Sequence, residues 1–372
     1  MDFLRYSLIM ALSPAAVLAS VIYSVVDLGP AGPGGTAYSI SNSGYVAGWV
    51  VDALGAPHAT LFGAQESRRL SLPPGAAGGI ATAVTEDGSI AGAMYSGGFA
   101  RAVLCRQGTC SSIDGLGGGD SYATAMNSRG QIAGGATTAN GQGHAFRYDN
   151  RVVRDIGTLP GGSWSSAYAV NQSGTVAGTS ETGSGDFRGF VWDEHRGMQA
   201  IGTLGGRHSY AMAISGHGQV AGHSTSVSGY LEAYMYAEGA LHRLGTLGGS
   251  QSFAYGINSR GEVVGYSWTG GDRTTSAFLY RQGMLWDLNG LLDGVNGWTL
   301  SEAYGINDAG QIVGAGLVDG QRRAFLLEPH RNDELVANPE PSTIALMAGG
   351  LALVAISRIR VNARLKPPPD GR

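Results

Sequence analysis

The chain has 372 residues, of which 14% are charged, 43% are hydrophobic and 62 are glycine. Disordered segments lack the β-branched and aromatic residues that recur here, so this composition excludes a disordered chain. The net charge of −4 supplies no basic surface, and no nucleic acid partner is expected. The many glycines favour short strands joined by tight turns.

Residues 1–20 have the pattern of a secretory signal peptide. Arg5 precedes an apolar run of about a dozen residues, and the modest side chains of Val17 and Ala19 favour cleavage near Ala19. An uncleaved anchor is the alternative, although Pro14 and the shortness of the run argue against it. The sequence therefore predicts export through the Sec pathway.

Residues 21–330 repeat one pattern with a period near 44 residues. Each copy has an alanine, an aliphatic residue three positions later, a turn that ends in glycine, and a strand of small residues. The turn glycines are Gly44, Gly88, Gly130, Gly174, Gly218, Gly261 and Gly310. Two more strand signals follow in each period, an aliphatic-aromatic run such as HAFRY and a short run before a glycine-rich corner such as GTLGG. Four short strands per period match one blade of a β-propeller.

The order of strand types in the repeats predicts a closed ring. Residues 23–29 resemble the fourth strand of a repeat, whereas the last repeat stops after its third strand, residues 324–328. If the N-terminal strand completes the last unit, no sheet edge stays open. The sequence thus predicts an all-β fold, a seven-bladed β-propeller of four-stranded antiparallel blades closed by the N-terminal strand. A β-solenoid or another stacked array is the alternative.

The topology of such blades also predicts a binding face. Connections from the second to the third strand, and from the fourth strand to the next blade, share one face and are the long, variable ones; function often uses such loops. Exposed aromatics beside Arg and Asp suit sugar rings and their hydroxyls, and the alternative is that each aromatic caps a blade core. The candidate residues are Trp164, Phe187, Arg188, Arg207, His208, Trp268, Asp272, Arg273 and Trp298.

Other polar residues at repeat positions predict structural roles. Cys105 and Cys110 flank a four-residue loop, so a disulfide across a hairpin is expected in an oxidising compartment, with a free catalytic thiol as the alternative. The recurring asparagines are expected to hydrogen-bond their own turns. They are Asn127, Asn171, Asn258 and Asn307.

Motifs of the common catalytic sites are missing from the sequence. It has no His-x-x-x-His pair, no Gly-x-Ser-x-Gly elbow and no phosphate loop before a helix. No metal, cofactor or catalytic residue is therefore expected. Two functions stay open: a non-catalytic binding or structural module, and a secreted carbohydrate-active enzyme with carboxylates around the propeller axis.

The C-terminal segment has the pattern of a short membrane anchor. An apolar run from Ile344 to Ile356 precedes a basic cluster of Arg358, Arg360 and Arg364. As a helix this run rises roughly 20 Å, less than the ~30 Å hydrocarbon core, so it is a marginal span. The basic cluster places the preceding residues outside the cytoplasm. A plain anchor helix after a proline-rich linker is one interpretation.

This tail resembles the PEP-CTERM sorting signal of exported proteins in Gram-negative bacteria that make extracellular polysaccharide. The resemblance rests on Pro339, Glu340, Pro341 and Ser342, on the apolar run, and on the arginines; the extra KPPPDGR departs from the family pattern. It implies residues 331–341 as linker, residues 342–372 as anchor and basic tail, and an exosortase-type sorting enzyme as partner. The expected location is the inner membrane before processing, then the cell surface or extracellular matrix, where polysaccharide is a possible partner.

The repeats themselves resemble the HAF family of probable extracellular repeats. His144, Ala145 and Phe146 supply the naming tripeptide, and the GTLGG corners and the AYGIN runs fit the same pattern. The resemblance covers nearly all of residues 23–328. It implies an extracellular location and a repeat architecture, and it brings no catalytic residues.

Overall fold

The computed structural model describes residues 21–63, 66–294 and 297–331. The predicted signal peptide, the sorting motif at Pro339–Ser342 and the predicted anchor lie outside these ranges. Within them, no helix is long and apolar enough to cross a membrane.

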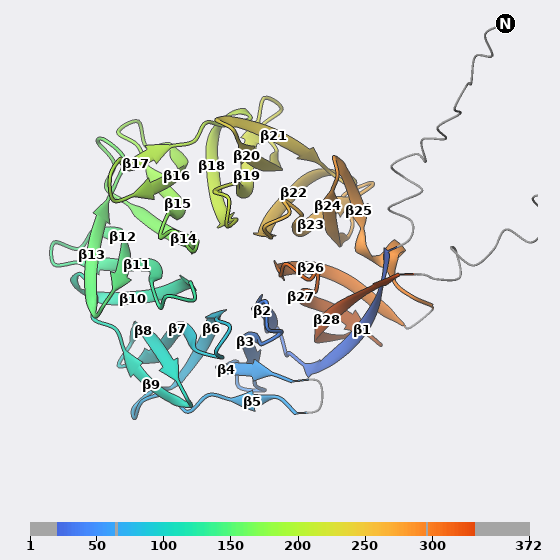
Figure 1. The fold of residues 1–372 in the computed structure, drawn as a ribbon, viewed down its shortest axis with the longest axis horizontal. Helices are drawn as coiled ribbons and strands as arrows, with labels where there is room; N and C mark the ends of the chain where they lie inside the picture. Colours follow the sequence, from blue (N-terminus) through green and yellow to red (C-terminus); the bar gives the residue numbers. More distant parts are fainter. Residues whose placement is uncertain (1–20, 64–65, 295–296, 332–372) are drawn as a thin grey trace, which may run out of the picture. The chain divides into compact units, whose positions relative to one another are not determined.

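Residues 23–329 form one compact unit of seven four-stranded antiparallel sheets around an axis (Figure 1). The predicted seven-bladed β-propeller is confirmed. Blade 1 consists of β2 (Thr36–Ile40), β3 (Val46–Val51), β4 (Pro57–Phe62) and β5 (Arg68–Arg69). Blade 2 consists of β6 (Gly78–Val84), β7 (Ile90–Ser96), β8 (Phe99–Arg106) and β9 (Thr109–Ser112). Blade 3 consists of β10 (Gly117–Met126), β11 (Ile132–Thr138), β12 (Gly143–Asp149) and β13 (Val152–Gly157).

Blades 4 to 7 continue the same order of strands. Blade 4 consists of β14 (Ser165–Val170), β15 (Val176–Glu181), β16 (Phe187–Asp193) and β17 (Gly197–Ala200), and blade 5 of β18 (Gly205–Ile214), β19 (Val220–Ser226), β20 (Leu231–Ala237) and β21 (Ala240–Gly245). Blade 6 consists of β22 (Gly248–Ile257), β23 (Val263–Thr269), β24 (Thr275–Arg281) and β25 (Met284–Asp287). Blade 7 consists of β26 (Trp298–Ile306), β27 (Ile312–Val318) and β28 (Gln321–Arg331) together with β1 (Val21–Pro30). A 3₁₀ helix, η1 (Leu288–Leu291), forms the corner between blades 6 and 7.

The N-terminal strand closes the ring as the sequence predicted. In blade 7 the strand order is β1-β28-β27-β26, so β1 is its outermost strand. An ion pair joins Arg323 Nε on β28 to Asp27 Oδ2 on β1 at 2.8 Å. The hydroxyl of Ser24 donates to the carbonyl of Glu328 at 3.5 Å. β28 spans Gln321–Arg331 and is longer than the predicted third strand.

The repeat pattern reflects how each blade packs. In six of the seven blades an aromatic residue of the third strand lies over the glycine that ends the small-residue pattern of the second strand, whereas blade 2 has Val103 opposite this glycine. In blade 4 the ring of Phe190 is so close to Gly178 that a Cβ on the glycine would lie 2.7 Å from it. Each described core cluster joins two neighbouring blades; one of them combines Ala133 of blade 3 with Phe190 of blade 4. The core therefore lies between the blades, and burial of the aromatic ring supplies much of its apolar area.

The two ends of the blades differ, as the topology predicted. The first-to-second and third-to-fourth turns form one end, here named the turn face. The second-to-third hairpins and the corners between blades form the other end, here named the loop face. Because consecutive strands are antiparallel neighbours in every blade, this assignment follows from the sheet order.

The recurring asparagines hold the turns, and they also bridge the blades. Asn171 Oδ1 accepts hydrogen bonds from the backbone N–H groups of Ser173 (3.1 Å) and Thr175 (3.0 Å), which confirms the predicted structural role. Its Nδ2 donates to the carbonyl of Ser215 in the next blade at 3.3 Å. The other three make the same bridge: Asn127 to Asn171, Asn258 to Asn307, and Asn307 to Ser41. The contacts between blades were not predicted from the sequence.

The two cysteines pair across a hairpin of blade 2. Cys105 on β8 lies opposite Cys110 on β9, and their sulfur atoms are 2.01 Å apart. This is the disulfide expected from the sequence. It ties the short outermost strand of the blade to its neighbour.

The third-to-fourth turn of blade 3 carries two residues in the left-handed region, Asn150 (φ 49°) and Arg151 (φ 66°). At the second position the corresponding turns have glycine: Gly108, Gly239 and Gly283. A non-glycine residue in the left-handed region costs about 1–2 kcal/mol. Glycine removes this cost, but it loses more conformational freedom on folding, which offsets part of the gain in stability. Arg151→Gly is therefore expected to raise the free energy of unfolding by about 0.5–1 kcal/mol.

Chemical denaturation of the Arg151→Gly variant measures this effect. Gly239→Arg places the same strain in blade 5 and is expected to lower the free energy of unfolding. If Arg151→Gly leaves stability unchanged or lower, backbone strain at this turn is not the controlling term.

Candidate binding face

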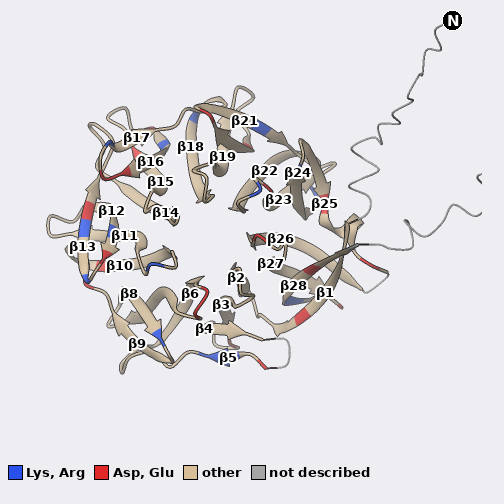
Figure 2. Cartoon of the chain, viewed as in Figure 1, with Lys and Arg blue, Asp and Glu red and all other residues tan. Residues whose placement is uncertain are grey.

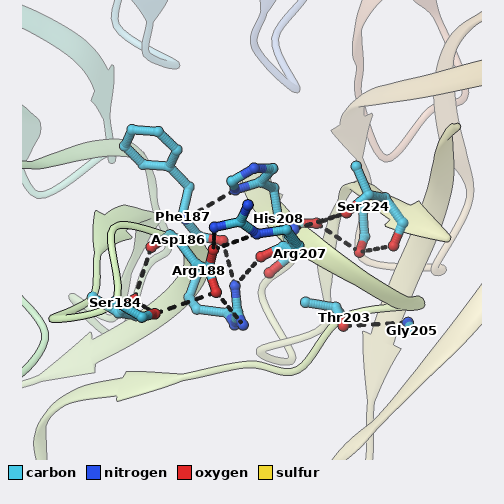
Figure 3. Close-up of polar contacts among 12 residues, drawn as sticks. Ser184, Asp186, Phe187, Arg188, Thr203, Gly205, Arg207, His208 and Ser224 are labelled. Atoms are coloured by element: carbon cyan, nitrogen blue, oxygen red, sulfur yellow. Dashed lines mark hydrogen bonds and ion pairs between the residues drawn. The ribbon is translucent and has the colours of Figure 1, made fainter. Parts of the chain in front are cut away.

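Four of the nine candidate residues, Phe187, Arg188, Arg207 and His208, gather where blades 4 and 5 meet on the loop face (Figure 3). A fifth, Trp164, adjoins them from the corner between blades 3 and 4, where its side chain also covers Gly143 of blade 3. Trp164 directly precedes β14, Phe187 and Arg188 begin β16, and Arg207 and His208 lie in β18. The rings of Trp164 and Phe187 meet edge to face with centroids 5.6 Å apart. The Phe187 and His208 rings follow at 5.8 Å. We name these residues, together with Asp186, the blade 4–5 cluster.

Charged hydrogen bonds hold the cluster together. Arg207 Nη2 is 2.7 Å from Asp186 Oδ1, and Arg188 Nη2 is 3.5 Å from Asp186 Oδ2. The guanidinium of Arg188 also donates to the Arg207 carbonyl. The hydrogen bond from Arg207 is the main reason why the pKa of Asp186 lies below its ordinary value. A carboxylate thus fixes two arginines from neighbouring blades, and most of the Arg207 side chain, 74%, stays exposed.

The orientation of the His208 ring is fixed from the backbone. The N–H of Phe187 donates to His208 Nδ1 at 3.1 Å. In the neutral ring the proton therefore resides on Nε2, which is left as a donor. The cluster combines aromatic edges, an imidazole N–H and an exposed guanidinium within one corner of the loop face.

The remaining four candidates lie on blades 6 and 7, so the nine residues do not form one site. Trp268 is the penultimate residue of β23, and its side chain covers Gly249, where a Cβ would lie 2.6 Å from the tryptophan Cβ. Asp272 accepts a hydrogen bond from the N–H of Ser250 at 2.7 Å, which ties a hairpin to the neighbouring corner. Arg273 is exposed in that hairpin.

Trp298 supports the core-capping alternative. It begins β26, is partly buried, and meets the edge of the fully buried Phe325 at 6.1 Å. Both residues belong to blade 7. The position of Trp298 is therefore explained by packing within its own blade, because the two strands are neighbours of β27.

Two elements of the loop face were not singled out from the sequence. Asp186 pairs with Arg188 and Arg207. The only sequence feature that could have pointed to Asp186 was its place beside Phe187 in a variable hairpin. Exposed large apolar side chains also concentrate on the second-to-third hairpins. They are Leu54, Tyr95, Phe99, Val227, Tyr230 and Leu317. They are spread over blades 1, 2, 5 and 7, and single exposed apolar side chains of this kind are ordinary on a protein surface.

Charged residues of the propeller are sparse, and both signs are interspersed around the ring (Figure 2). Among the described residues, no group of three or more His, Cys, Asp or Glu side chains is placed to hold a metal ion. His144, the histidine of the HAF tripeptide, is held by Asp155 at 2.8 Å, and His58 is held by Asp52 at 2.8 Å. These histidines therefore serve local structure.

Comparisons with known proteins agree with the class of fold. No protein family model and no curated protein matches the sequence. The β-propeller domain of the trilobed protease from Pyrococcus furiosus is similar in structure, with 9% identity over 85% of this chain and 98% of that one, and a TM-score of 0.51. TolB from Acinetobacter baumannii has 14% identity over 78% of this chain and 67% of that one, with a TM-score of 0.46. At 9% identity the likeness to the protease domain shows the β-propeller fold alone.

Proposed function

We propose that this chain is an exported, non-catalytic binding module of the cell envelope, whose loop face binds extracellular polysaccharide. The observation that carries the proposal is the blade 4–5 cluster. Aromatic ring faces can stack on the apolar faces of sugar rings, while exposed Arg207 and the Nε2 of His208 can donate to hydroxyl or carboxylate groups. The apolar hairpins around the ring extend the contact surface.

Export is supported by both ends of the sequence. The signal-like segment at residues 1–20 and the resemblance of the tail to the PEP-CTERM signal favour delivery through the Sec pathway, anchoring, and sorting by an exosortase-type enzyme. The HAF-like repeats favour an extracellular location. The disulfide between Cys105 and Cys110 suits an oxidising compartment.

The contacts of two carboxylates that line a cavity at the turn face support a non-catalytic role. Glu86 accepts hydrogen bonds from the N–H groups of Asn42 (3.2 Å) and Ser43 (2.7 Å) in the neighbouring blade. Asp308 accepts from the N–H of Ser259 at 2.8 Å. Both side chains stabilise turns between blades, a role that accounts for their presence at the turn face without an acid or base function.

Replacing Trp164 with alanine is expected to weaken polysaccharide binding at least about tenfold, equivalent to ~1.4 kcal/mol. The tryptophan supplies the largest ring of the cluster, and it contacts Phe187. Arg207→Ala, which removes an exposed side chain, is expected to weaken binding similarly. Binding is measured on a glycan array of bacterial polysaccharides and by titration with the array's best ligand.

Trp268→Ala is the matched control, because Trp268 belongs to blade 6 and lies outside the cluster. It is expected to retain binding, and the double variant Trp164→Ala/Trp268→Ala should bind like Trp164→Ala. Thermal melts establish that each variant is folded. Wild-type affinity in the Trp164 and Arg207 variants would remove the proposed site, and hydrolysis of an array glycan by the purified chain would replace the binding function with an enzymatic one.

A further inference from the structure

The axis of the propeller is lined by the seven innermost strands β2, β6, β10, β14, β18, β22 and β26 (Figure 1). Each of them carries a β-bulge at the same repeat position, where the pairing with the second strand skips one residue; in blade 1 it skips from Ala37 to Ser39. A bulge turns its extra residue out of the normal alternation of the strand. The bulged residues are Tyr38, Thr82, Thr124, Tyr168, Met212, Tyr255 and Tyr304.

All seven bulged residues line a cavity of about 180 Å³ on the axis. A second cavity of about 310 Å³ adjoins it on the side of the turn face and is lined by turn residues such as Asn42, Ser128 and Gln172, and by the carboxylates Glu86 and Asp308. The two cavities adjoin, because both are lined by Ser39, Ile40, Met126, Val170, Ile214, Ile257 and Ile306. Together they are here named the axial channel, and their volume is at the small end of the range of ligand sites.

Tyrosines give the inner part of the channel its chemistry. Tyr38 and Tyr304 stack with centroids 5.3 Å apart, and Tyr255 meets Tyr304 edge to face at 5.3 Å. The hydroxyl of Tyr304 donates to Glu302 at 3.0 Å, and Arg322 holds Glu302 at 2.5 Å. A polar contact with Glu302 therefore holds the hydroxyl of Tyr304, against which the rings of Tyr38 and Tyr255 pack.

The channel also offers hydrogen-bonding capacity that the protein does not use. The Tyr38 hydroxyl has no hydrogen-bond partner within the described part of the chain. Burial raises the pKa of this side chain. Thr82 and Thr124, by contrast, use their hydroxyls on backbone carbonyls of the next blade, both at 2.9 Å. The inner cavity is lined entirely by uncharged residues. Burying a charged ligand among them would carry a large desolvation cost.

We propose that the axial channel binds one neutral sugar unit, either a free monosaccharide or the end of a glycan chain, which enters from the turn face. Tyrosine rings offer flat apolar surfaces, and hydroxyl groups such as that of Tyr38 pair with sugar hydroxyls. The size of the channel suits a single unit and excludes the body of a branched polymer. This site lies apart from the blade 4–5 cluster and does not depend on it.

Titration of the full-length chain with glucose, galactose, mannose, rhamnose and N-acetylglucosamine tests the proposal. At least one of these sugars is expected to bind with a millimolar or lower Kd. Tyr38→Phe removes one hydroxyl and keeps the ring, so it should weaken that binding about tenfold. Met212→Phe places a bulkier side chain in the channel and should weaken it as well. An oligosaccharide that ends in the same sugar tests whether a chain end can enter.

Tyr45→Phe is the matched control, because it removes a hydroxyl from an exposed tyrosine on the turn face that does not line the channel. It should bind sugar like the wild type. The proposal is overturned if none of the five sugars binds, or if Tyr38→Phe and Met212→Phe, both folded by thermal melt, bind as the wild type does. Loss of sugar binding in Trp164→Ala alone would assign the sugar to the loop face, which overturns the channel site and leaves the proposed function standing.

Discussion

Replacing Leu28 with alanine is expected to lower the free energy of unfolding by about 2–5 kcal/mol, the usual cost of emptying a well-packed core site. Leu28 lies on β1, is only 5% exposed, and packs in a cluster that joins blades 1 and 7. Its partners there include Phe62 of blade 1 and Leu326 of β28. The substitution therefore weakens the junction at which the ring closes.

Equilibrium denaturation in urea measures this loss. Leu54→Ala is the matched control, because Leu54 is 94% exposed in a hairpin and its truncation should leave stability within about 0.5 kcal/mol. Equal stability of the Leu28 variant and the wild type would mean that closure by β1 adds little to the free energy of unfolding, and that the other six blades are stable without it.

The second large effect is a dependence of stability on pH that arises from His223. This side chain lies on β19, is 8% exposed, and is surrounded by the rings of Tyr210, Phe253 and Tyr255. Its Nδ1 has no hydrogen-bond partner among the described residues. Burial lowers the pKa of His223 from 6.5 to about 4.

The sign follows from proton uptake. Between pH 6.5 and about 4 the unfolded chain binds a proton at His223 that the folded chain does not, so stability falls as the pH decreases through this window. Above pH 6.5 the full stability is present. A shift of this size corresponds to a loss of ~3 kcal/mol across the window, at about 1.4 kcal/mol per pH unit.

His223→Phe removes the titrating group and keeps an aromatic ring among aromatic neighbours. Its free energy of unfolding, measured by denaturation at several pH values, should decline much less between pH 6.5 and 4 than that of the wild type. His217→Gln removes an exposed histidine and should follow the wild-type curve. Parallel curves for His223→Phe and the wild type would show that His223 does not control this window.

The number of blades and the closure of the ring were predictable from the sequence. Strands and turns are encoded locally, so the recurrence of a turn glycine about every 44 residues indicated the number of blades. The offset of strand types, with a fourth-strand pattern at residues 23–29, indicated closure before any contact was known. The pairing of Cys105 with Cys110 was also predictable, since only four residues separate them.

The candidate site was predictable only in part. Strand topology assigned the nine candidates to one face. It did not show that Phe187 and His208 meet while Trp268 and Trp298 lie on other blades, because the order of strands does not specify how neighbouring loops approach one another. Asp186 was missed for the same reason, since its importance comes from Arg207, which belongs to the next blade.

The sequence by itself determined the repeating blade and the strand that joins the two ends of the ring, because alternation, turn glycines and small-residue strands act over a few residues. Tertiary structure alone decided which side chains reach the axis and which residues bridge the blades. A bulge directs Tyr38 into the channel, and Asn171 reaches the carbonyl of Ser215, 44 residues away. Such contacts depend on the packing of one blade against the next, and no local pattern encodes that geometry.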